Sequence, residues 1–346
     1  MAAGGSPAAG GGRGLNGLSQ ERSKVKLQEI KKVAVIGAGL MGPGIALDFA
    51  KGGYAVSLCA RRQASLDQAQ LVVHANLLTL VKNDVVKQEE IAPIEARISY
   101  SLSIEDSARD ADFIVECINE KKDLKIELFK QLDACAKPDA IFGSNTSYLN
   151  VFELIPESRA TNTVVTHWFA PAHILPLVEV VRDPRVSKET EETVLAMLRY
   201  IGKTPVLMQK YVPGHAINRL LRIIGREVFF MLDNGFITAD QLDLAVKASI
   251  APRMCTLGVV QRYDFTGLEL SAGNLRLANY PEPPLDNAPK SLVSRVEKGD
   301  LGVKTGKGFF DYTDRPLEET LAKRDDDLIR VLKATEFALK DPPKPA

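Results

Sequence analysis

The sequence is poor in cysteine and in long apolar runs, and each shortage excludes a class of protein. No Cys-x-x-Cys pair and no histidine at zinc-binding spacing accompanies the four scattered cysteines, Cys59, Cys117, Cys135 and Cys255. This scatter excludes a disulfide framework, so we expect free thiols in a reducing compartment and no metal site. No apolar run approaches the ~18 residues of a membrane-spanning helix, so we expect no transmembrane segment.

An excess of charge of either sign is also missing, since 44 basic residues balance 44 acidic ones. Without a dense basic run, nucleic acid and anionic membranes are not expected partners. Residues 1–29 are rich in glycine and alanine and have no apolar signal-peptide core, so they are expected to form a disordered tail. A mitochondrial presequence stays open, but basic residues are sparse before Arg22, and a cytoplasmic protein is the default expectation.

The most informative segment that is present begins with an apolar run, Val33–Ile36. It continues as Gly37-Ala38-Gly39-Leu40-Met41-Gly42, a helix-like stretch follows from Pro43 to Lys51, and a second apolar run comes at Ala55–Cys59. Strand, glycine-rich turn, helix and strand at this spacing predict a dinucleotide-binding site. Gly37 would permit the tight turn, Gly39 the close approach of a pyrophosphate, and Gly42 the packing of helix on strand. We expect Leu40 and Met41 of this turn to contact the cofactor as well. The alternative is a glycine-rich turn without a ligand.

The end of the second strand departs from an ordinary NAD site. An acidic residue there would accept hydrogen bonds from the ribose 2′-hydroxyl, but the chain has Cys59-Ala60-Arg61-Arg62. Arginine pairs well with a 2′-phosphate, so Arg61 and Arg62 make NADP as plausible a cofactor as NAD. The alternative is that both arginines are solvated loop residues.

Apolar and β-branched runs recur along the first two hundred positions, and helical spacing lies between them. They predict strands at 33–36, 55–59, 98–100, 111–116, 140–143, 163–169 and 177–181. The alternation predicts an α/β protein with a Rossmann-like, doubly wound, mostly parallel sheet. After Val212-Pro213-Gly214 the pattern becomes helical, which predicts an all-α C-terminal domain. The expected organisation is a tail at 1–29, a dinucleotide-binding domain at 30–210, a helical substrate and dimerisation domain at 211–325, and a C-terminal helix and tail at 326–346.

A histidine and a glutamate supply the chemistry that a dinucleotide site needs. His167 ends an apolar strand and Glu179 lies in the next one, with Pro171 and Pro176 between them to turn the chain. A carboxylate bonded to one imidazole nitrogen fixes the tautomer and leaves the other nitrogen free to move a proton. Such a pair could take the proton of a hydroxyl group while a hydride leaves the same carbon.

Several motifs occur in a fixed order and carry a family resemblance. They are Gly37-Ala38-Gly39-Leu40-Met41-Gly42, Ser144-Asn145-Thr146-Ser147, His167-Trp168-Phe169-Ala170-Pro171, Leu177-Val178-Glu179-Val180 and Pro213-Gly214-His215-Ala216-Ile217-Asn218-Arg219. The chain resembles the 3-hydroxyacyl-CoA dehydrogenase family, including its lambda-crystallin/gulonate dehydrogenase and carnitine dehydrogenase branches. The resemblance implies a Rossmann-like first domain, a helical second domain that commonly dimerises, and oxidation of a 3-hydroxy group.

The resemblance also implies roles for particular residues. His167 matches the catalytic base and Glu179 its orienting carboxylate, while Ser147 and Asn218 match the polar pair that holds the substrate oxygen. Positions that contact the cofactor are matched by Glu120, Lys125, Asn145 and Lys304. Taken alone, Ser147 could be a helix N-cap, Asn218 a satisfied helix-start residue and Lys125 the partner of Glu116 or Glu120 in a surface bridge.

Three departures from the family pattern bear on the substrate. Ala170 replaces an asparagine that would line the site, and His215 replaces a phenylalanine. His215 is expected either to touch substrate, on a helical face shared with Asn218, or to be a partly exposed helix-start residue. The family's CoA contacts are represented only by the neighbourhood of Asn76 and Lys82, which weakens the expected anchor for a CoA phosphate.

The leading hypothesis is therefore an NAD- or NADP-dependent dehydrogenase that acts on a 3-hydroxyacyl-CoA, working as a homodimer in fatty acid metabolism. The runner-up is a dehydrogenase of a free 3-hydroxy acid, such as a sugar acid or a carnitine-like amine. A cofactor-binding structural protein of the crystallin type is the third alternative.

Overall fold

The computed structural model describes residues 29–277 and 282–340 of the chain. Of the predicted disordered tail at 1–29, residues 1–28 lie outside the described residues. The described residues divide into two compact units. Unit 1 comprises the residues up to Leu77 together with Lys87–His215, and unit 2 comprises Leu78–Val86 together with the residues from Ala216 onward.

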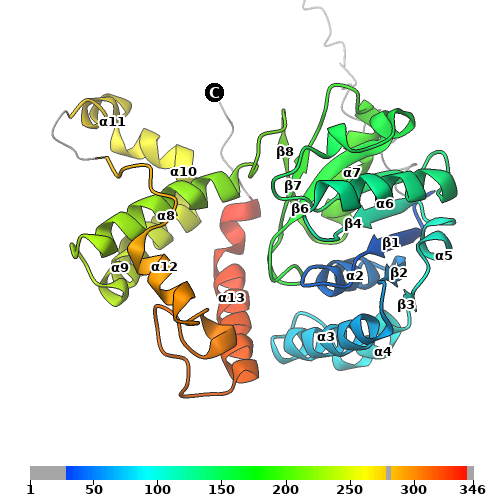
Figure 1. The fold of residues 1–346 in the computed structure, drawn as a ribbon, viewed down its shortest axis with the longest axis horizontal. Coiled ribbons are helices and arrows are strands. Elements are labelled where there is room, and N and C mark those ends of the chain that lie inside the picture. The colour runs from blue at the N-terminus through cyan, green and yellow to red at the C-terminus, as the bar shows by residue number, and fades with distance from the viewer. Residues whose placement is uncertain (1–28, 278–281, 341–346) are drawn as a thin grey trace, which may run out of the picture. The chain divides into compact units, whose positions relative to one another are not determined.

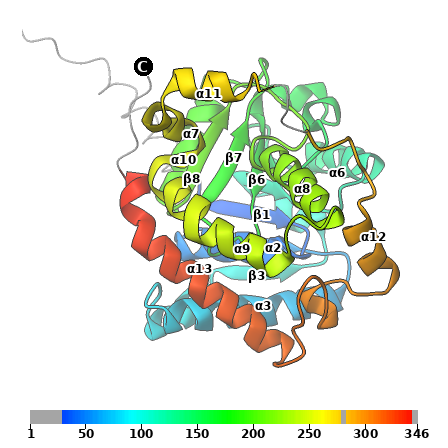
Figure 2. The same cartoon turned by 90° about the vertical axis from the view of Figure 1, so that its left-hand side faces the viewer.

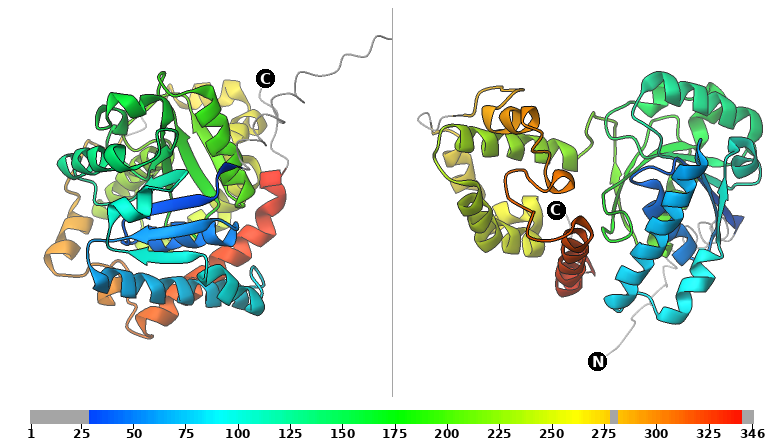
Figure 3. Two further views of the ribbon diagram at one scale, coloured as in Figure 1. Left: turned by 90° about the vertical axis from the view of Figure 1, so that its right-hand side faces the viewer. Right: turned by 60° about the horizontal axis from the view of Figure 1, so that its bottom comes forward.

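Unit 1 is built on an eight-stranded sheet with the order β3-β2-β1-β4-β5-β6-β7-β8. Its strands are β1 (Lys32–Ile36), β2 (Ala55–Cys59), β3 (Ile98–Ser101), β4 (Phe113–Glu116), β5 (Ile141–Ser144), β6 (Thr163–Trp168), β7 (Leu177–Val181) and β8 (Thr204–Met208). Only the β6–β7 pair is antiparallel. The left panel of Figure 3 shows β1, β2 and β3 as adjacent blue and cyan arrows. The predicted Rossmann-like, mostly parallel sheet is confirmed, and its strand order reverses direction at β1, where such folds bind dinucleotides.

Helices lie between the strands of unit 1 and make up most of unit 2 (Figure 1). Those of unit 1 are α2 (Gly42–Lys51), α3 (Gln63–Lys82, which continues into unit 2), α4 (Ile91–Glu95), α5 (Ile104–Ala108), α6 (Lys122–Cys135) and α7 (Lys188–Tyr200). Those of unit 2 are α8 (Ile217–Asp233), α9 (Ala239–Ala245), α10 (Ala251–Thr266), α11 (Leu268–Asn274), α12 (Lys290–Glu297) and α13 (Leu317–Lys340), with a π-helical segment at Val246–Ile250 between α9 and α10. Figure 2 looks onto α8, α9 and α12.

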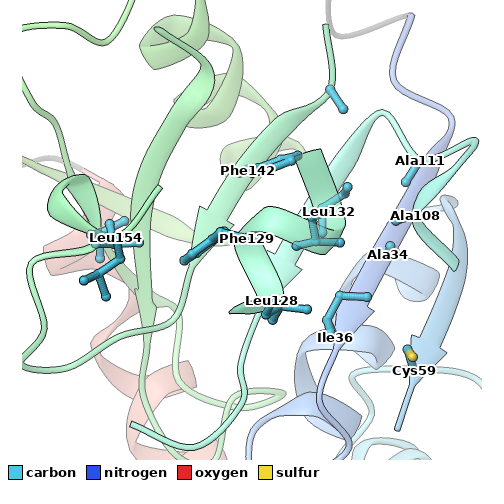
Figure 4. Close-up of a cluster of buried hydrophobic side chains, with 14 of the residues drawn as sticks. Ala34, Ile36, Cys59, Ala108, Ala111, Leu128, Phe129, Leu132, Phe142 and Leu154 are labelled. Atoms are coloured by element: carbon cyan, nitrogen blue, oxygen red, sulfur yellow. The ribbon is translucent and has the colours of Figure 1, made fainter. Parts of the chain in front are cut away.

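One face of the sheet packs against α5 and α6. Figure 4 shows Leu128, Phe129 and Leu132 of α6 beside Ala34 and Ile36 of β1. These side chains belong to one buried cluster, which continues through Ala108, Ala111, Phe142 and Leu154. Because alternate residues of a strand point to opposite faces, Val33 and Val35 of β1 are left for the other face.

The second face of the sheet is covered by α2. The ring of Phe49 lies 5.8 Å from that of Phe113 in β4 and 5.7 Å from that of Trp168 in β6. Burial of these rings fixes α2 on the strands and therefore fixes the glycine-rich turn that leads into it. Sheet and helices together hold the carboxyl ends of β1, β4, β5 and β6 at one edge.

The sequence prediction did not include α7 and β8 of unit 1. The helix α7 has a Ser187 N-cap whose hydroxyl accepts from the Thr190 amide, and its buried side chains include Val194 and Met197. Pro205 makes β8 hard to predict from the sequence, because proline cannot donate a hydrogen bond to a strand ladder and therefore argues against a central strand. The strand is nevertheless tolerated here because β8 is the last in the sheet.

In unit 2, α8 begins at Ile217, and Asn234 follows its last residue. Thr238 is the N-cap of α9, but its side chain makes no capping hydrogen bond. None of the helices in residues 29–277 and 282–340 combines the length and the apolar character needed to cross a membrane.

Candidate active site

The glycine-rich turn has the geometry that the sequence predicts for a dinucleotide cradle. Gly37 has a φ of 121°, and a Cβ atom on it would lie 2.6 Å from the Cys117 carbonyl oxygen. A Cβ atom on Gly42 would lie 1.9 Å from the Gly37 carbonyl oxygen, so α2 can approach β1 only without a side chain there. Gly39, in contrast, has nothing within 4 Å of such an atom, so the space beside its backbone is open. The turn therefore fits a pyrophosphate at Gly39, next to the N-terminus of α2.

A cavity of about 390 Å³ adjoins this turn. The residues that line it include Gly39, Arg61, Arg62, Ser65, Cys117 and Glu127. This volume lies within the ~300–1,000 Å³ typical of small-molecule sites. Burial raises the pKa of the Cys117 thiol, whose Sγ donates to the Gly37 carbonyl oxygen, so this cysteine is a structural thiol and not a nucleophile.

The remaining predicted cofactor contacts of this region lie at the same cavity or on the same turn. Leu40 is 87% exposed, and Met41 directly precedes α2. Arg61 and Arg62 are both exposed and both line the cavity, so their two interpretations, solvated loop residues and phosphate partners, are each compatible with their position.

His167 and Glu179 meet directly across the antiparallel strands β6 and β7. They are register partners, and His167 Nδ1 lies 2.8 Å from Glu179 Oε2. Both side chains are buried. A carboxylate can only accept, so Nδ1 carries the proton and the second ring nitrogen, Nε2, is left with a lone pair.

Ser147 provides the partner for that second nitrogen. Its hydroxyl oxygen lies 3.1 Å from His167 Nε2, on the loop that follows β5. Ser147 does not cap an α-helix, since the next helical turn is a short 3-10 segment, Val151–Glu153, whose N-cap residue is Asn150. The structure thus brings together three of the four predicted catalytic residues in a line from carboxylate to imidazole to hydroxyl.

Glu120 binds the hydrogen-bond donors of the loop around Ser147. Its Oε1 atom accepts from the Thr146 hydroxyl at 2.6 Å, from the Ser147 amide at 2.9 Å and from the Tyr148 amide at 2.8 Å. Burial raises the pKa of Glu120, but these donors and the Lys125 ammonium outweigh it and lower the pKa below 4.5. One carboxylate oxygen therefore orders the backbone on both sides of Ser147.

The backbone carbonyl groups of the same loop accept hydrogen bonds from the segment 211–215. His215 Nε2 lies 2.9 Å from the Thr146 carbonyl oxygen, and the Gly214 amide donates to the Ser147 carbonyl at 3.0 Å. The Tyr211 hydroxyl donates to the Tyr148 carbonyl oxygen. Three successive carbonyls are thus bound by one short segment that is distant in the sequence.

The expectation of a surface bridge at Lys125 was wrong. Lys125 is fully buried, and its Nζ lies 2.6 Å from Glu116 Oε1 and 3.2 Å from Glu120 Oε2. Both expected partners are therefore engaged at once. Because α6 is packed against the sheet, the side chain is enclosed and links the end of β4 to the Ser147 loop through Glu120.

The expectation for His215 as a helix-start residue was also wrong. Its backbone has a φ of 48°, and α8 begins only at Ile217, so no helical face joins His215 to Asn218. The side chain is completely buried, and its ring centre lies 5.1 Å from that of His167. His215 is thus a second histidine beside the candidate base.

Other predicted residues are placed as follows. Asn145 uses its side-chain oxygen to accept from the Trp168 amide at 2.8 Å, which ties the loop after β5 to the end of β6. Asn218 lies in the first turn of α8 and Lys304 in a 3-10 segment, Val303–Thr305, both in unit 2. Their expected contacts with substrate and cofactor stay predictions.

The residues tied to substrate specificity also have defined surroundings. Ala170 is exposed and precedes Pro171. Asn76 is half-buried, and Lys82 Nζ lies 2.6 Å from Asp326 of α13. Lys82 is therefore paired with a carboxylate of the protein itself.

Sequence reasoning missed Thr146 and Tyr211, which take part in holding the Ser147 loop. Thr146 was part of a quoted motif, but a hydroxyl next to a candidate catalytic residue carries no signal for a distant carboxylate. Tyr211 precedes Val212-Pro213-Gly214, and an aromatic hydroxyl before a turn is compatible with many partners.

Comparisons with known proteins identify the family of this chain. The family model for the 3-hydroxyacyl-CoA dehydrogenase NAD-binding domain matches residues 32–211, and the model for the C-terminal domain matches residues 214–312. The 3-hydroxybutyryl-CoA dehydrogenase of Clostridioides difficile is 32% identical over 284 residues, which cover 81% of this chain and 99% of the relative.

Two further relatives act on compounds whose names contain no CoA. The L-carnitine dehydrogenase of Burkholderia mallei is 31% identical over 314 residues, 86% of this chain and 94% of the relative. A solved structure of 5-formyl-3-hydroxy-2-methylpyridine 4-carboxylic acid 5-dehydrogenase, an NAD+-dependent dismutase, has a TM-score of 0.79 at 26% identity and covers 89% of this chain and 99% of that one. With matches across both units and relatives above 30% identity over most of their length, the chain belongs to the 3-hydroxyacyl-CoA dehydrogenase family of NAD-dependent oxidoreductases.

Proposed function

We propose that this enzyme interconverts a 3-hydroxyacyl-CoA and the corresponding 3-ketoacyl-CoA. A nicotinamide cofactor held at the turn of Gly37, Gly39 and Gly42 would supply the hydride acceptor for the carbon that bears the hydroxyl group. His167 Nε2 takes the hydroxyl proton, Glu179 stabilises the imidazolium that results, and the Ser147 hydroxyl donates to the substrate oxygen. Asn218 is the proposed third contact to that oxygen. In the reverse direction the same proton returns from His167 to the oxygen.

The observation that carries this proposal is the chain of contacts from Glu179 to His167 to Ser147. A buried carboxylate 2.8 Å from Nδ1 leaves Nε2 as the basic atom, and the Ser147 hydroxyl oxygen lies 3.1 Å from Nε2. The arrangement stands at the carboxyl ends of the parallel strands, which is the edge where ligands bind in such sheets.

A free 3-hydroxy acid is the second candidate substrate, and one observation favours it. Lys82, in the region expected to anchor a CoA phosphate, is 2.6 Å from Asp326, so its charge is already partly neutralised. The relatives named for carnitine and for a pyridine carboxylic acid support a substrate without CoA.

For the coenzyme, we propose that NADP is accepted as well as NAD. Arg61 and Arg62 line the cavity at the end of β2, where a carboxylate would repel a 2′-phosphate. Binding of NADH and NADPH to the Arg61→Asp variant tests this, with Arg199→Asp on α7 as the control for charge reversal. Loss of NADPH affinity by about tenfold, with NADH affinity kept, is expected. Equal NADPH affinity in wild type and Arg61→Asp would make the arginines bystanders.

A matrix of cofactors and substrates tests the proposed reaction. Purified protein is assayed with NAD and NADP, each against 3-hydroxybutyryl-CoA, longer 3-hydroxyacyl-CoA thioesters and the corresponding free acids. Turnover of the thioesters that is lost in His167→Ala is the expected result. Turnover of free acids alone would replace the leading proposal by the second candidate, and turnover of none would leave a cofactor-binding structural role.

Assembly and compartment also remain proposals. A homodimer through the helical unit is supported by exposed apolar side chains on α8, Leu220, Leu221, Ile223 and Ile224. Light scattering of the purified chain tests it. The four free cysteines support a cytoplasmic location. The change of sequence pattern near residue 210 supports a domain boundary there.

A further inference from the structure

His215 contributes an unused hydrogen-bonding atom beside the candidate base. Its Nε2 atom lies 2.9 Å from the Thr146 carbonyl oxygen, which can only accept, so Nε2 carries the ring proton. The other nitrogen, Nδ1, is buried and has no hydrogen-bond partner among residues 29–277 and 282–340. Burial and the neighbouring His167 lower the pKa of His215, although its bond to Thr146 opposes the shift. At neutral pH, Nδ1 is therefore a bare lone pair.

This lone pair has a cost that the protein alone does not offset. A buried polar atom without a partner costs about 1–3 kcal/mol, so it calls for an explanation. The backbone adds a second observation, because His215 has a φ of 48°, a left-handed conformation that side chains other than glycine rarely adopt. Strain of this kind persists where surrounding contacts impose it, and it concentrates at functional sites. Here the His215 amide is also fixed, by donation to the Val212 carbonyl oxygen at 2.9 Å.

The position of the ring identifies the place where a partner would come from. Its centre lies 5.1 Å from the centre of the His167 ring, and its bonded carbonyl belongs to the residue before Ser147. A substrate carbinol held between His167 Nε2 and Ser147 Oγ would have its neighbouring carbons within reach of this ring. A plain alkyl chain has no hydrogen-bond donor that could pair with an acceptor at that point.

We propose that His215 Nδ1 accepts a hydrogen bond from a second hydroxyl group of the substrate, on the carbon next to the reacting carbinol. The proposal rests on the proposed function, because it takes the carbinol position from His167 and Ser147. It makes the preferred substrate a 2,3- or 3,4-dihydroxy compound, and it applies to the thioester and to the free acid alike. His215 then separates polyhydroxylated substrates from ordinary acyl chains.

Two substitutions separate the two nitrogens of the ring. His215→Gln can still donate to the Thr146 carbonyl but has no acceptor in the place of Nδ1. His215→Asn puts its side-chain oxygen near the place of Nδ1 and suits a positive φ, but it cannot reach Thr146. Tyr211→Phe is the matched control, because it removes another hydrogen bond to the same loop and keeps the aromatic ring whose centre lies 6.1 Å from that of His215.

The kinetic experiment compares kcat/KM for 3-hydroxybutyrate, 2,3-dihydroxybutyrate and 3,4-dihydroxybutyrate, each as the free acid and as the CoA thioester. Wild type is expected to prefer one dihydroxy compound by about 5- to 100-fold, the range of one satisfied buried acceptor. The ratio should fall to near one in His215→Gln and persist in His215→Asn and Tyr211→Phe. A wild-type ratio near one, or a ratio that His215→Gln leaves unchanged, would overturn the proposal.

If the enzyme turns over none of these probes, the proposed function is wrong. A second measurement then still tests the role of His215. Nitrogen-15 NMR of histidine-labelled wild type, assigned by the signal lost in His215→Gln, reports which ring nitrogen carries the proton. The expected result at neutral pH is an unprotonated Nδ1 whose signal moves with a dihydroxybutyrate and not with 3-hydroxybutyrate. A protonated Nδ1, or one that neither dihydroxybutyrate shifts, would sink the idea.

Discussion

Glu179 lies directly opposite His167 in the antiparallel pair of strands β6 and β7, with Oε2 2.8 Å from Nδ1. Two neighbouring strands of one sheet thus fix the pair, with no loop involved. The imidazole orientation is set by the ladder before any ligand binds, which is the arrangement that precise proton transfer requires.

Replacement of Glu179 by glutamine should impair turnover much more than folding. The amide cannot support an imidazolium, so kcat should fall on the order of a hundredfold, as it should in His167→Ala. Steady-state kinetics with the best substrate of the matrix checks this. Glu105→Gln on α5, an exposed carboxylate paired with Arg109, is the control and should keep full activity. Wild-type kcat in Glu179→Gln would remove the orienting role.

The glycines of the cofactor turn should fail in different ways. Gly39→Ala adds a methyl group where nothing lies within 4 Å, so the melting temperature should hold while NADH affinity falls. Gly42→Ala adds it 1.9 Å from the Gly37 carbonyl oxygen, so the fold itself should lose stability. Thermal unfolding and fluorescence titration with NADH separate the two. The same pattern in both variants would contradict this division.

Glu120 should make stability depend on acid pH. Its pKa is lowered from 4.5 in the folded chain, so the unfolded chain binds more protons in acid. The stability it contributes is therefore complete above about pH 4.5 and is lost as the pH falls through the folded value. Urea unfolding of wild type and Glu120→Gln from pH 7 to pH 3 should give a difference that shrinks below pH 4.5. A difference that stays constant across this range would speak against the assignment.

Removal of the Lys125 charge should destabilise the protein strongly. Lys125→Met leaves Glu116 buried without its ammonium partner, and breaking such a pair costs about 3–5 kcal/mol. Urea unfolding at neutral pH measures the loss. Lys122→Met, three positions earlier on the same helix and exposed, should change the free energy of unfolding by less than about 0.5 kcal/mol. Equal effects of the two substitutions would show that the buried pair adds nothing.

The sequence was most informative where one local rule was sufficient. Strand periodicity and the glycine spacing gave the sheet and the cofactor turn, and two prolines between His167 and Glu179 indicated the strand pair. Such rules could not predict the hydrogen bonds that hold the Ser147 loop, because Glu120 and Tyr211 lie 27 and 63 positions away from the loop residues that they bind. His215 was misread because its left-handed backbone depends on contacts with Val212 and Thr146, and histidine itself does not signal that conformation.

Pro205 has a consequence for how the sheet ends. The Thr204 amide donates toward β7, to the Pro176 carbonyl oxygen at 2.8 Å, so the next backbone nitrogen along β8 points to the open side. Because that nitrogen belongs to proline, the outer rim of β8 lacks a donor where a foreign strand would begin to pair. The edge is thereby protected against strand addition and aggregation, at no cost to the ladder inside the sheet.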